Sequence, residues 1–460
     1  MPDPSTRFHG RIRMHSTLID SRFLGGLFST EAMRAVFSDT ATLDRYVDTE
    51  VALAVAQGKL GVIPAEAAAA IAKHAHGIEL DLERLRRETH NVGYPILPLV
   101  HQLAEGLGEA GRYLHWGATT QDIMDTALVL QIRDALDLIE SDLQGVAGQL
   151  RRLTREHRDT PMAGRTHLQH ALPTSFGLKT AIWLGMAERN LERLAQLRPR
   201  VLVGQFAGAG GTLASLGDRG LDVQQAMMSE LGLGVPATTW HTARDALAET
   251  AQWLGLITAS LAKMAFDVSL MMANEFGEVY EPFVPGRGAS STMPQKRNPI
   301  SCEVMIGAAK TVRHLAGLAL DAAVQDFERA TGPWQAEWVA LPEAFLHTAG
   351  AVSQALFMLT GLEVDAQRMR KNLDSSGGLI VAEAVMMGLA PILGRNEAHD
   401  LVYAACRISL EQRRPLAEVL KQDPKVTSLT SAETIDALCE PQNYLGSTGK
   451  MIDRMLERGA

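Results

Sequence analysis

Apolar residues recur at alternating steps of three and four along residues 129–153 of the chain. The positions are Val129, Ile132, Leu136, Ile139, Leu143, Val146, Leu150 and Leu153. A repeat of about 3.5 residues is typical of helices that pack almost parallel in a bundle. We therefore expect a helix of roughly 35 residues here, on the order of 50 Å long.

Similar apolar patterns predict further long helices at about 175–198, 240–276 and 301–324. Shorter helical segments surround them. In the first, Leu43, Val47, Val51 and Val55 recur every four residues, Gly61 and Pro64 end the helix, and an alanine-rich run at 65–73 starts the next one. The pattern predicts an all-α protein with three helical domains, at residues 1–116, 117–360 and 361–460.

One long stretch, residues 282–303, interrupts this helical pattern. Its proline and glycine residues are Pro282, Pro285, Gly286, Gly288, Pro294 and Pro299, and between them lie Ser290, Ser291, Lys296 and Asn298. Pro and Gly punctuation predicts an exposed loop. The loop is either a solvated connector or a binding loop, in which backbone N–H groups, hydroxyls and a lysine hold an anion.

Composition narrows the function classes. With 46% hydrophobic and 21% charged residues and a net charge of −9, the chain shows no electrostatic footprint for nucleic acid or an anionic membrane. The most apolar stretch, 251–273, carries Lys263 and Asp267 near its centre, which favours a buried helix over a membrane span. Three distant cysteines and the absence of a secretory pattern in residues 1–16 predict a soluble, cytoplasmic protein.

The segment His115-Trp116-Gly117-Ala118-Thr119-Thr120-Gln121-Asp122 leads directly into the longest predicted helix. Thr119, Thr120 and Asp122 are residue types that cap helices, and the free N–H groups of a helix N-terminus favour a bound carboxylate. Plain capping is the alternative. Asp122 and Asp125 lie one helical turn apart, a spacing that is common on solvated helix starts and by itself does not indicate a metal site.

For three histidines, the local sequence by itself gives only weak evidence of a functional role. His90 lies in an irregular stretch, 89–100, and His167 and His170 are three apart without a convincing third metal ligand nearby. The glycine-rich run 204–212 lacks the βαβ context that a dinucleotide site requires. Each of these histidines is therefore either a structural residue or a catalytic one.

The loop sequence S-S-T-M-P-Q-K-R-N-P resembles the signature loop of the fumarase/aspartase superfamily, in residues Ser290, Ser291, Met293, Pro294, Lys296, Asn298 and Pro299. The segment around Thr119 and Thr120 is similar to the superfamily's first conserved region, and Arg165-Thr166-His167-Leu168-Gln169 to its second. Thr89-His90-Asn91-Val92 loosely resembles a segment of adenylosuccinate lyases. The resemblance implies Ser290 as the proton-transfer group and His167 as a general acid or substrate-orienting group.

It also implies that Lys296 and Asn298 stabilise charge, and that the substrate-binding residues are Thr119, Thr120, Gln169, Ser291, Met293, Arg329 and His90. Superfamily chemistry moves a proton beside a carboxylate, and the costly species is an aci-carboxylate with an extra negative charge. One lost donor to such a species costs on the order of 3–4 kcal/mol. No metal or organic cofactor is required, and the resemblance implies a homotetramer whose active sites are shared between subunits.

Residues 327–343 distinguish between branches of the superfamily. Adenylosuccinate lyases share Glu328-Arg329 but then carry Ser and Arg residues that grip a phosphate, where this chain has Trp334 and Trp338. The run instead resembles 3-carboxy-cis,cis-muconate cycloisomerase, so the expected substrate is a small polycarboxylate. Two alternatives stay open: a C–N lyase that releases fumarate from a succinyl adduct, and a non-catalytic helical protein like the lens crystallins.

Overall fold

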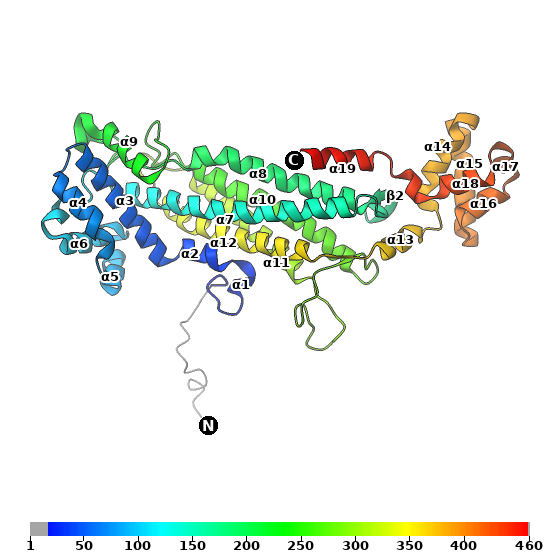
Figure 1. The fold of residues 1–460 in the computed structure, drawn as a ribbon, viewed down its shortest axis with the longest axis horizontal. Coiled ribbons are helices and arrows are strands. Elements are labelled where there is room, and N and C mark those ends of the chain that lie inside the picture. The colour runs from blue at the N-terminus through cyan, green and yellow to red at the C-terminus, as the bar shows by residue number, and fades with distance from the viewer. Residues whose placement is uncertain (1–16, 459–460) are drawn as a thin grey trace, which may run out of the picture. The chain divides into compact units, whose positions relative to one another are not determined.

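Helices form almost all regular structure in the computed structural model, which describes residues 17–458 (Figure 1). The strands are short and form two two-stranded antiparallel sheets, β1 with β2 and β3 with β4. The predicted all-α class is confirmed. Residues 1–16, in which the sequence shows no secretory pattern, lie outside the described residues.

Five long helices occupy the middle of the chain: α7 (Thr120–Glu156), α8 (Phe176–Val201), α10 (Asp245–Met272), α11 (Ile300–Ala322) and α12 (Pro333–Thr360). The helix of about 35 residues predicted from the 3.5-residue repeat is α7, with 37 residues. All eight residues of the repeat are buried. The other three predicted long helices correspond to α8, α10 and α11.

The chain forms two compact units, each assembled from three separate stretches. Unit 1 comprises Met1–Asp142, Asn190–Leu261 and Val304–Gln354, and unit 2 comprises Leu143–Arg189, Ala262–Glu303 and Ala355–Ala460. Each long helix therefore contributes one part to each unit. The predicted division into three domains at residues 116 and 360 stays a prediction.

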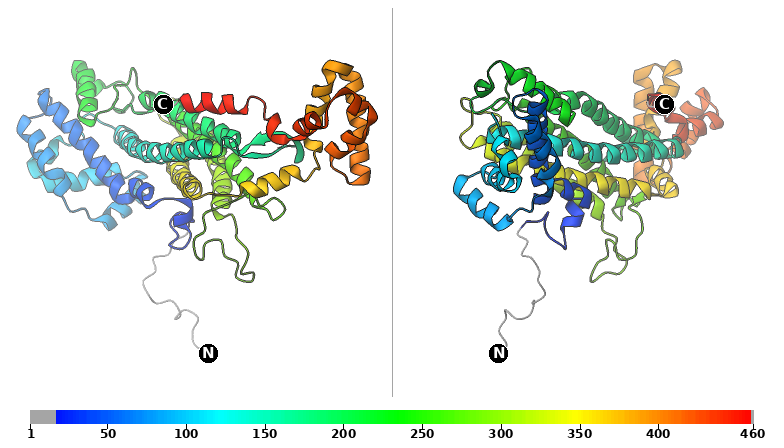
Figure 2. Two further views of the ribbon diagram at one scale, coloured as in Figure 1. Left: turned by 45° about the vertical axis from the view of Figure 1, so that its right-hand side comes forward. Right: turned by 60° about the vertical axis from the view of Figure 1, so that its left-hand side comes forward.

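Unit 1 has two hydrophobic clusters at the N-terminal part of α7. One packs α7 against the shorter helices α3 to α6, and the other packs α7 against α3 and α9. Figure 2 shows the ribbon of these helices in two further views. The shorter helices of this unit are α1 (Gly25–Phe28), α2 (Glu31–Val36), α3 (Asp39–Lys59), α4 (Ala65–His74), α5 (Leu82–Val92), α6 (Ile96–Leu107) and α9 (Gly220–Leu231).

Unit 2 contains all four strands and the C-terminal helices. The strands are β1 (Pro161–Thr166), β2 (Gln169–Ser175), β3 (Val279–Tyr280) and β4 (Glu363–Val364). The helices are α13 (Ala366–Asp374), α14 (Ala382–Leu393), α15 (Arg395–Gln412), α16 (Leu416–Gln422), α17 (Pro424–Leu429), α18 (Ala432–Cys439) and α19 (Thr448–Glu457). A hydrophobic cluster joins α14, α15, α16, α17 and α18. Cys302, Cys406 and Cys439 are free thiols.

Helix α10 is the one described helix that is long and apolar enough by itself to cross a membrane. In its most apolar window 44% of the residues are buried, and the Trp253 indole N–H donates to the carbonyl of Asn190 at 3.0 Å. Core helices of soluble proteins also meet the length and composition test, and the predicted buried helix stays a prediction.

The predicted irregular stretch at 89–100 is shorter than expected. His90 lies in the last turn of α5, and α6 begins at Ile96, so only Gly93, Tyr94 and Pro95 separate the helices. Gly93 ends α5 with a φ of 89°, the left-handed conformation typical after a helix. Pro98 lies in the first turn of α6, where its missing N–H leaves no hydrogen bond unmade.

Candidate active site

The N-terminus of α7 is capped by an aspartate rather than by a threonine hydroxyl. Asp122 reaches back so that its Oδ2 accepts the backbone N–H of Thr119 at 3.0 Å. This is the reciprocal half of a capping box. The Thr119 hydroxyl oxygen instead accepts a hydrogen bond from Nη1 of Arg329 at 3.2 Å. Thr120, half-buried, is the first residue of the helix. Plain capping by Thr119 is therefore not what the structure shows.

The carboxylate of Asp122 is fully occupied by protein donors. It accepts the N–H groups of Ala207 and Gly208, both at 2.9 Å, and Nε2 of His241 at 2.8 Å. The glycine-rich run at 204–212 therefore wraps around an aspartate. No group of three or more His, Cys, Asp or Glu side chains within residues 17–458 could hold a metal ion.

Arg329 is held entirely by neutral acceptors. Besides the Thr119 hydroxyl, its Nε donates to Oε1 of Gln121 at 3.1 Å, and its Nη2 to the carbonyl of Ala209 at 3.2 Å. These contacts orient the guanidinium without neutralising its charge. The structure thus brings together two predicted substrate-binding residues, Thr119 and Arg329, at a helix N-terminus that favours anions.

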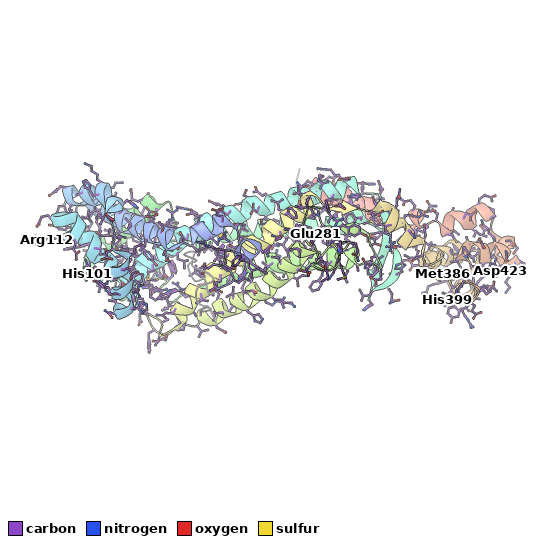
Figure 3. All side chains as sticks on the ribbon, turned by 90° about the horizontal axis from the view of Figure 1, so that it is seen from below. His101, Arg112, Glu281, Met386, His399 and Asp423 are labelled. Carbon is purple, nitrogen blue, oxygen red and sulfur yellow. The ribbon has the colours of Figure 1, made fainter. Side chains whose placement is uncertain are left out.

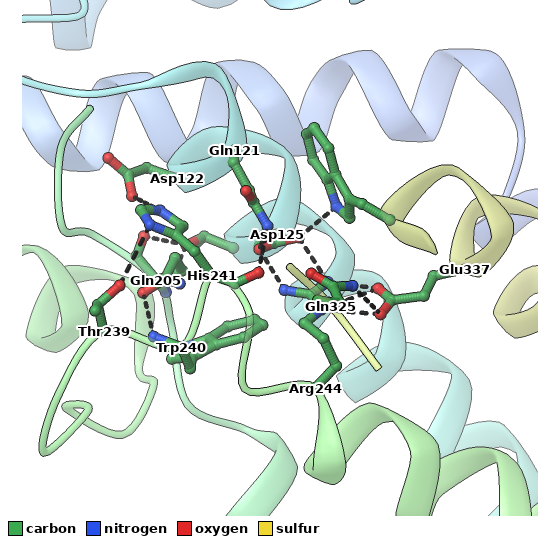
Figure 4. Close-up of polar contacts among 12 residues, drawn as sticks. Gln121, Asp122, Asp125, Gln205, Thr239, Trp240, His241, Arg244, Gln325 and Glu337 are labelled. Atoms are coloured by element: carbon green, nitrogen blue, oxygen red, sulfur yellow. Dashed lines mark hydrogen bonds and ion pairs between the residues drawn. The ribbon is translucent and has the colours of Figure 1, made fainter. Parts of the chain in front are cut away.

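A buried ion network supports this part of unit 1 (Figure 4). Arg244 forms a bidentate pair with Asp125 at 2.6 and 2.9 Å and also pairs with Glu337 at 2.6 Å. The side chains are almost completely buried. Burial raises the pKa of Glu337, Arg244 opposes this shift, and the nearby Asp125 carboxylate adds to it. Gln121 connects the network to Arg329, because its Nε2 donates to Asp125.

Trp334 and Trp338 pack into an aromatic cluster with Tyr94. The Trp334 ring stacks on Tyr94 at 5.6 Å between centroids and meets Trp338 edge-on at 5.2 Å. The Trp334 indole N–H donates to Oδ1 of Asp125 at 3.1 Å. These two residues therefore present ring surface and a carboxylate-bound N–H, which is a poor environment for a phosphate dianion. His90 is exposed on the last turn of α5.

The signature loop, residues 282–303, belongs to unit 2, and a buried glutamate anchors its C-terminal end. Glu281, labelled in Figure 3, accepts the backbone N–H groups of Ser301 at 3.1 Å and of Cys302 at 2.9 Å. These groups lie in the first turn of α11, where a carboxylate stabilises both the free N–H groups and the helix dipole. The start of the loop is thereby joined to its end.

A second contact closes the base of the loop. Glu363 of β4 accepts Arg297 in a bidentate pair at 3.0 and 3.2 Å, and its Oε1 also accepts the N–H of Phe283 at 3.1 Å. Arg297 in addition donates to the carbonyl of Glu281 at 2.7 Å. One carboxylate therefore contacts both arms of the loop. The bonded N–H of Asn298 and carbonyl of Gly288, 3.0 Å apart, complete the closure.

Ser290 lies at the tip of this closed loop with two backbone donors facing its oxygen. Its Oγ accepts the N–H of Met293 at 3.1 Å and the N–H of Thr292 at 3.3 Å. Two such dipoles stabilise negative charge on the hydroxyl oxygen, which a serine needs in order to exchange a proton. The N–H of Lys296 bonds to the carbonyl of Met293 at 3.1 Å. Ser291, Met293 and Lys296 are exposed.

His167 lies at the apex of the β1–β2 hairpin, also in unit 2. His167 and Leu168 form its two-residue turn with φ values of 50° and 62°. Such turns need positive φ at both positions and usually use Asn and Gly. A non-glycine residue in this conformation costs on the order of 1–3 kcal/mol. The hairpin thus holds an exposed imidazole in a strained turn, with Gln169, also exposed, directly after it.

Four residues that hold the predicted site residues in place were not predicted from the sequence: Glu281, Glu363, Gln121 and Glu337. Glu281 directly precedes the loop and could have been noticed there, whereas Glu363 lies 66 residues from Arg297 in the chain. Gln121 and Glu337 stand inside recognised motifs without a spacing that indicates their partners. The structure places the predicted residues in two groups, Thr119, Thr120, Arg329 and His90 in unit 1, and Ser290, Ser291, Met293, Lys296, Asn298, His167 and Gln169 in unit 2.

Comparison with known proteins identifies the family. A lyase family model matches residues 27–313, and a model for the adenylosuccinate lyase C-terminus matches residues 378–455. The 3-carboxy-cis,cis-muconate cycloisomerase of Pseudomonas aeruginosa is 48% identical, over 93% of this chain and 94% of the relative. Trans-aconitate decarboxylase 1 of Mycosarcoma maydis is 45% identical, over 95% of this chain and 88% of the relative.

A solved structure agrees with this assignment. A fumarate lyase from Mesorhizobium sp. BNC1 is 55% identical and superposes with a TM-score of 0.89, over 94% of this chain and 98% of that structure. The family model covers more than half of the chain, and the relatives match it over nearly its full length. The chain therefore belongs to the fumarase/aspartase superfamily of lyases, as a member that resembles 3-carboxy-cis,cis-muconate cycloisomerases.

Proposed function

We propose that this enzyme interconverts 3-carboxy-cis,cis-muconate and its carboxymuconolactone. In the lactone-forming direction, an oxygen of an internal carboxylate adds across a double bond, and the neighbouring carbon, which bears a carboxylate, gains a proton. In the reverse direction that proton leaves and the C–O bond breaks. This isomerisation needs neither an oxidant nor a reductant. The protein supplies only proton transfer and stabilisation of charge.

The packing of Trp334 and Trp338 is the observation that carries this proposal. Where adenylosuccinate lyases have residues that grip a phosphate, these rings pack on Tyr94 and on each other. A few residues before Trp334, Arg329 lies beside Thr119 with its charge not neutralised by a carboxylate contact. This combination suits a carboxylate on an unphosphorylated acid. The 48% identity to a cycloisomerase supports the same choice.

Ser290 exchanges the proton in the proposed reaction. The N–H groups of Thr292 and Met293 stabilise its oxygen when it is deprotonated. Lys296, Asn298 and loop N–H groups stabilise the aci-carboxylate, for which each donor contributes on the order of 3–4 kcal/mol. Closure of the loop over the substrate excludes water, which strengthens these interactions.

Thr119, Thr120 and Arg329 hold a second carboxylate in the proposal, with His90, Gln169, Ser291 and Met293 as further contacts. His167 acts as the general acid or orients the substrate. We propose that the active sites are shared between the subunits of a homotetramer, since members of this superfamily are typically oligomeric. We also propose that the enzyme is cytoplasmic.

A fumarate-releasing lyase is the second candidate. The observation that favours it is the 55% identity to a structure described as a fumarate lyase. Such an enzyme would use the same Ser290 to remove a proton from a succinyl adduct, with an amine rather than a carboxylate as leaving group. The residues of the loop serve both reactions equally, so the substrate has to be established by assay.

Ultraviolet absorbance with a panel of acids separates the candidates. The panel contains carboxymuconate, adenylosuccinate, simple succinyl amines and fumarate with an amine. We expect loss of the conjugated diene of carboxymuconate and no turnover of adenylosuccinate. Release of fumarate from a succinyl amine, with carboxymuconate unchanged, would replace the first proposal by the second. Chelator should leave the rate unchanged, and light scattering should report a tetramer.

A further inference from the structure

Gln121 lies between the buried ion network and Arg329. Its side chain is almost fully buried, in the first turn of α7. The amide nitrogen donates to Oδ2 of Asp125 at 3.1 Å and to the carbonyl of His241 at 2.9 Å. The amide oxygen accepts Nε of Arg329 at 3.1 Å. Both ends of this amide are therefore engaged, as Figure 4 shows for the nitrogen.

The partners fix the direction in which the amide points. Two acceptors, a carboxylate and a carbonyl, face one end, and a guanidinium faces the other. A reversed amide would place its oxygen against both acceptors and its N–H groups against Arg329. Asp125 is in turn immobilised by Arg244, which also pairs with Glu337. The oxygen that meets Arg329 is therefore held by a rigid, buried set of contacts.

A neutral acceptor at this position has a specific consequence for Arg329. A carboxylate oxygen here would also accept Nε of Arg329, but it would neutralise the guanidinium, and its second oxygen would face the Asp125 carboxylate and the His241 carbonyl. The amide, the Thr119 hydroxyl and the Ala209 carbonyl orient it and leave its positive charge in place. Among residues 17–458, no carboxylate lies within ion-pair distance of Arg329, so its charge is available for an anionic ligand.

We propose that Gln121 is a positioning residue, which holds the Arg329 guanidinium beside the Thr119 hydroxyl in the orientation that binds a substrate carboxylate. Gln121 acts through Arg329 and does not touch the substrate. The inference rests on the proposed function only in that the substrate is a carboxylic acid. The substrate carboxylate that Arg329 binds lies away from the reacting carbon. Loss of the Gln121 contact should therefore weaken binding of the ground state and of the transition state equally.

Two substitutions test the two properties of the glutamine. Gln121→Met keeps the size of the side chain and removes the acceptor for Arg329. Gln121→Glu keeps an acceptor and brings a negative charge against the guanidinium. A hydrogen bond to a charged group contributes enough to change affinity by roughly ten- to a hundredfold. Both variants should therefore raise KM by this factor, with kcat within about threefold of wild type.

Gln131→Met is the matched control in the same helix. Gln131 is also a buried amide, whose nitrogen donates to the carbonyl of Val36 at 2.8 Å and to the Thr42 hydroxyl at 3.0 Å. Its loss should lower stability and leave KM unchanged. This comparison separates a positioning role from a general effect of losing a buried amide in α7.

A folded Gln121→Met or Gln121→Glu enzyme with wild-type KM overturns the proposal, as does an equal rise in KM in Gln131→Met. If Gln121→Met does not fold, Gln121→Ala, which also removes the acceptor for Arg329, takes its place with the same expected rise in KM. The KM values are measured with whichever acid of the panel the wild type converts. If the wild type does not convert carboxymuconate, the proposed reaction is wrong, but the test of Gln121 still applies with another acid of the panel. If the wild type converts none of them, calorimetric titration with carboxymuconolactone supplies the affinity ratio instead.

Discussion

Arg165 and Glu278, whose carboxylate is fully buried, form a bidentate ion pair that joins the β1–β2 hairpin of unit 2 to the segment leading into its signature loop. Nη2 of Arg165 lies 2.6 Å from Oε1 of Glu278, and Nη1 lies 3.0 Å from Oε2. Arg165 is in the strand before His167, and Glu278 directly precedes β3, from which the chain enters the signature loop. Asn372 donates to the same carboxylate at 2.8 Å. The hairpin with His167 and the base of the loop with Ser290 therefore share one anchor.

Removing this anchor should cost stability. Glu278→Ala leaves the Arg165 charge buried without its partner, and breaking a buried pair in this way costs about 3–5 kcal/mol. Chemical denaturation measures the change in the free energy of unfolding. Glu83→Ala, which removes an exposed partner of Arg86, is the control and should cost less than about 1 kcal/mol. Equal losses in the two variants would contradict the assigned role of the pair.

Ser290→Ala tests the proton-transfer assignment. The variant should fold normally, because Ser290 contacts only backbone N–H groups and Thr292 at the exposed tip of the loop. We expect turnover to fall by at least about a hundredfold, the lower range for loss of an acid–base group. Ser291→Ala, a hydroxyl removed at the next position, should affect kcat much less. Near-normal turnover in Ser290→Ala would remove Ser290 from the mechanism.

His167→Asn separates the chemistry of the imidazole from the geometry of the turn. Asparagine tolerates the positive φ of this position, so the hairpin and the free energy of unfolding should be preserved or improved. Turnover should nevertheless fall by about a hundredfold or more if the imidazole transfers a proton. Leu168→Gly relieves strain at the next residue and is the control, with activity expected near wild type. A fully active His167→Asn enzyme would exclude the acid–base role.

The long helices could be predicted because their signal is local and repeated. Eight buried positions in α7 follow one period, and no tertiary information is needed to recognise it. The β1–β2 hairpin could not be predicted in this way. Its turn consists of His167 and Leu168, which have none of the turn preferences of Asn-Gly, and tertiary contacts such as Arg165 to Glu278 hold it in place. The sequence predicts an irregular stretch around His90 because a proline in a helix interior would break the helix. Pro98 instead lies in the first turn of α6, where a helix accepts proline.

The candidate site could be predicted residue by residue, but its connections could not. Thr119 and Arg329 were each recognised from their own motif, and nothing in the sequence joins them across 210 positions. The pairing of Arg165 with Glu278 spans 113 positions. Such contacts depend on how the helices pack. A single sequence shows each of the two residues but does not indicate which distant residue is its partner. Gln121 was visible as part of a motif, while its role required the positions of Asp125 and Arg329.

His115 and Glu50 should make stability depend on pH above the unfolded-state pKa of the histidine. Nδ1 of His115 lies 2.6 Å from Oε1 of Glu50, whose side chain is completely buried. Burial opposes the charged imidazole, but the charge of Glu50 and the hydrogen bond to it outweigh this, so the pKa of His115 is raised. The folded protein then binds the proton more tightly than the unfolded chain does.

This linkage fixes the sign of the effect. Stability from the pair is fully present below the unfolded-state pKa of about 6.5 and is lost as the pH rises through the higher folded-state value. The free energy of unfolding, measured by guanidinium denaturation between pH 6 and pH 9, should fall more steeply with pH in the wild type than in His115→Gln. Parallel curves for the two proteins would show that the imidazole is not held in its charged form, because only a proton bound preferentially in the folded state can produce the difference in slope.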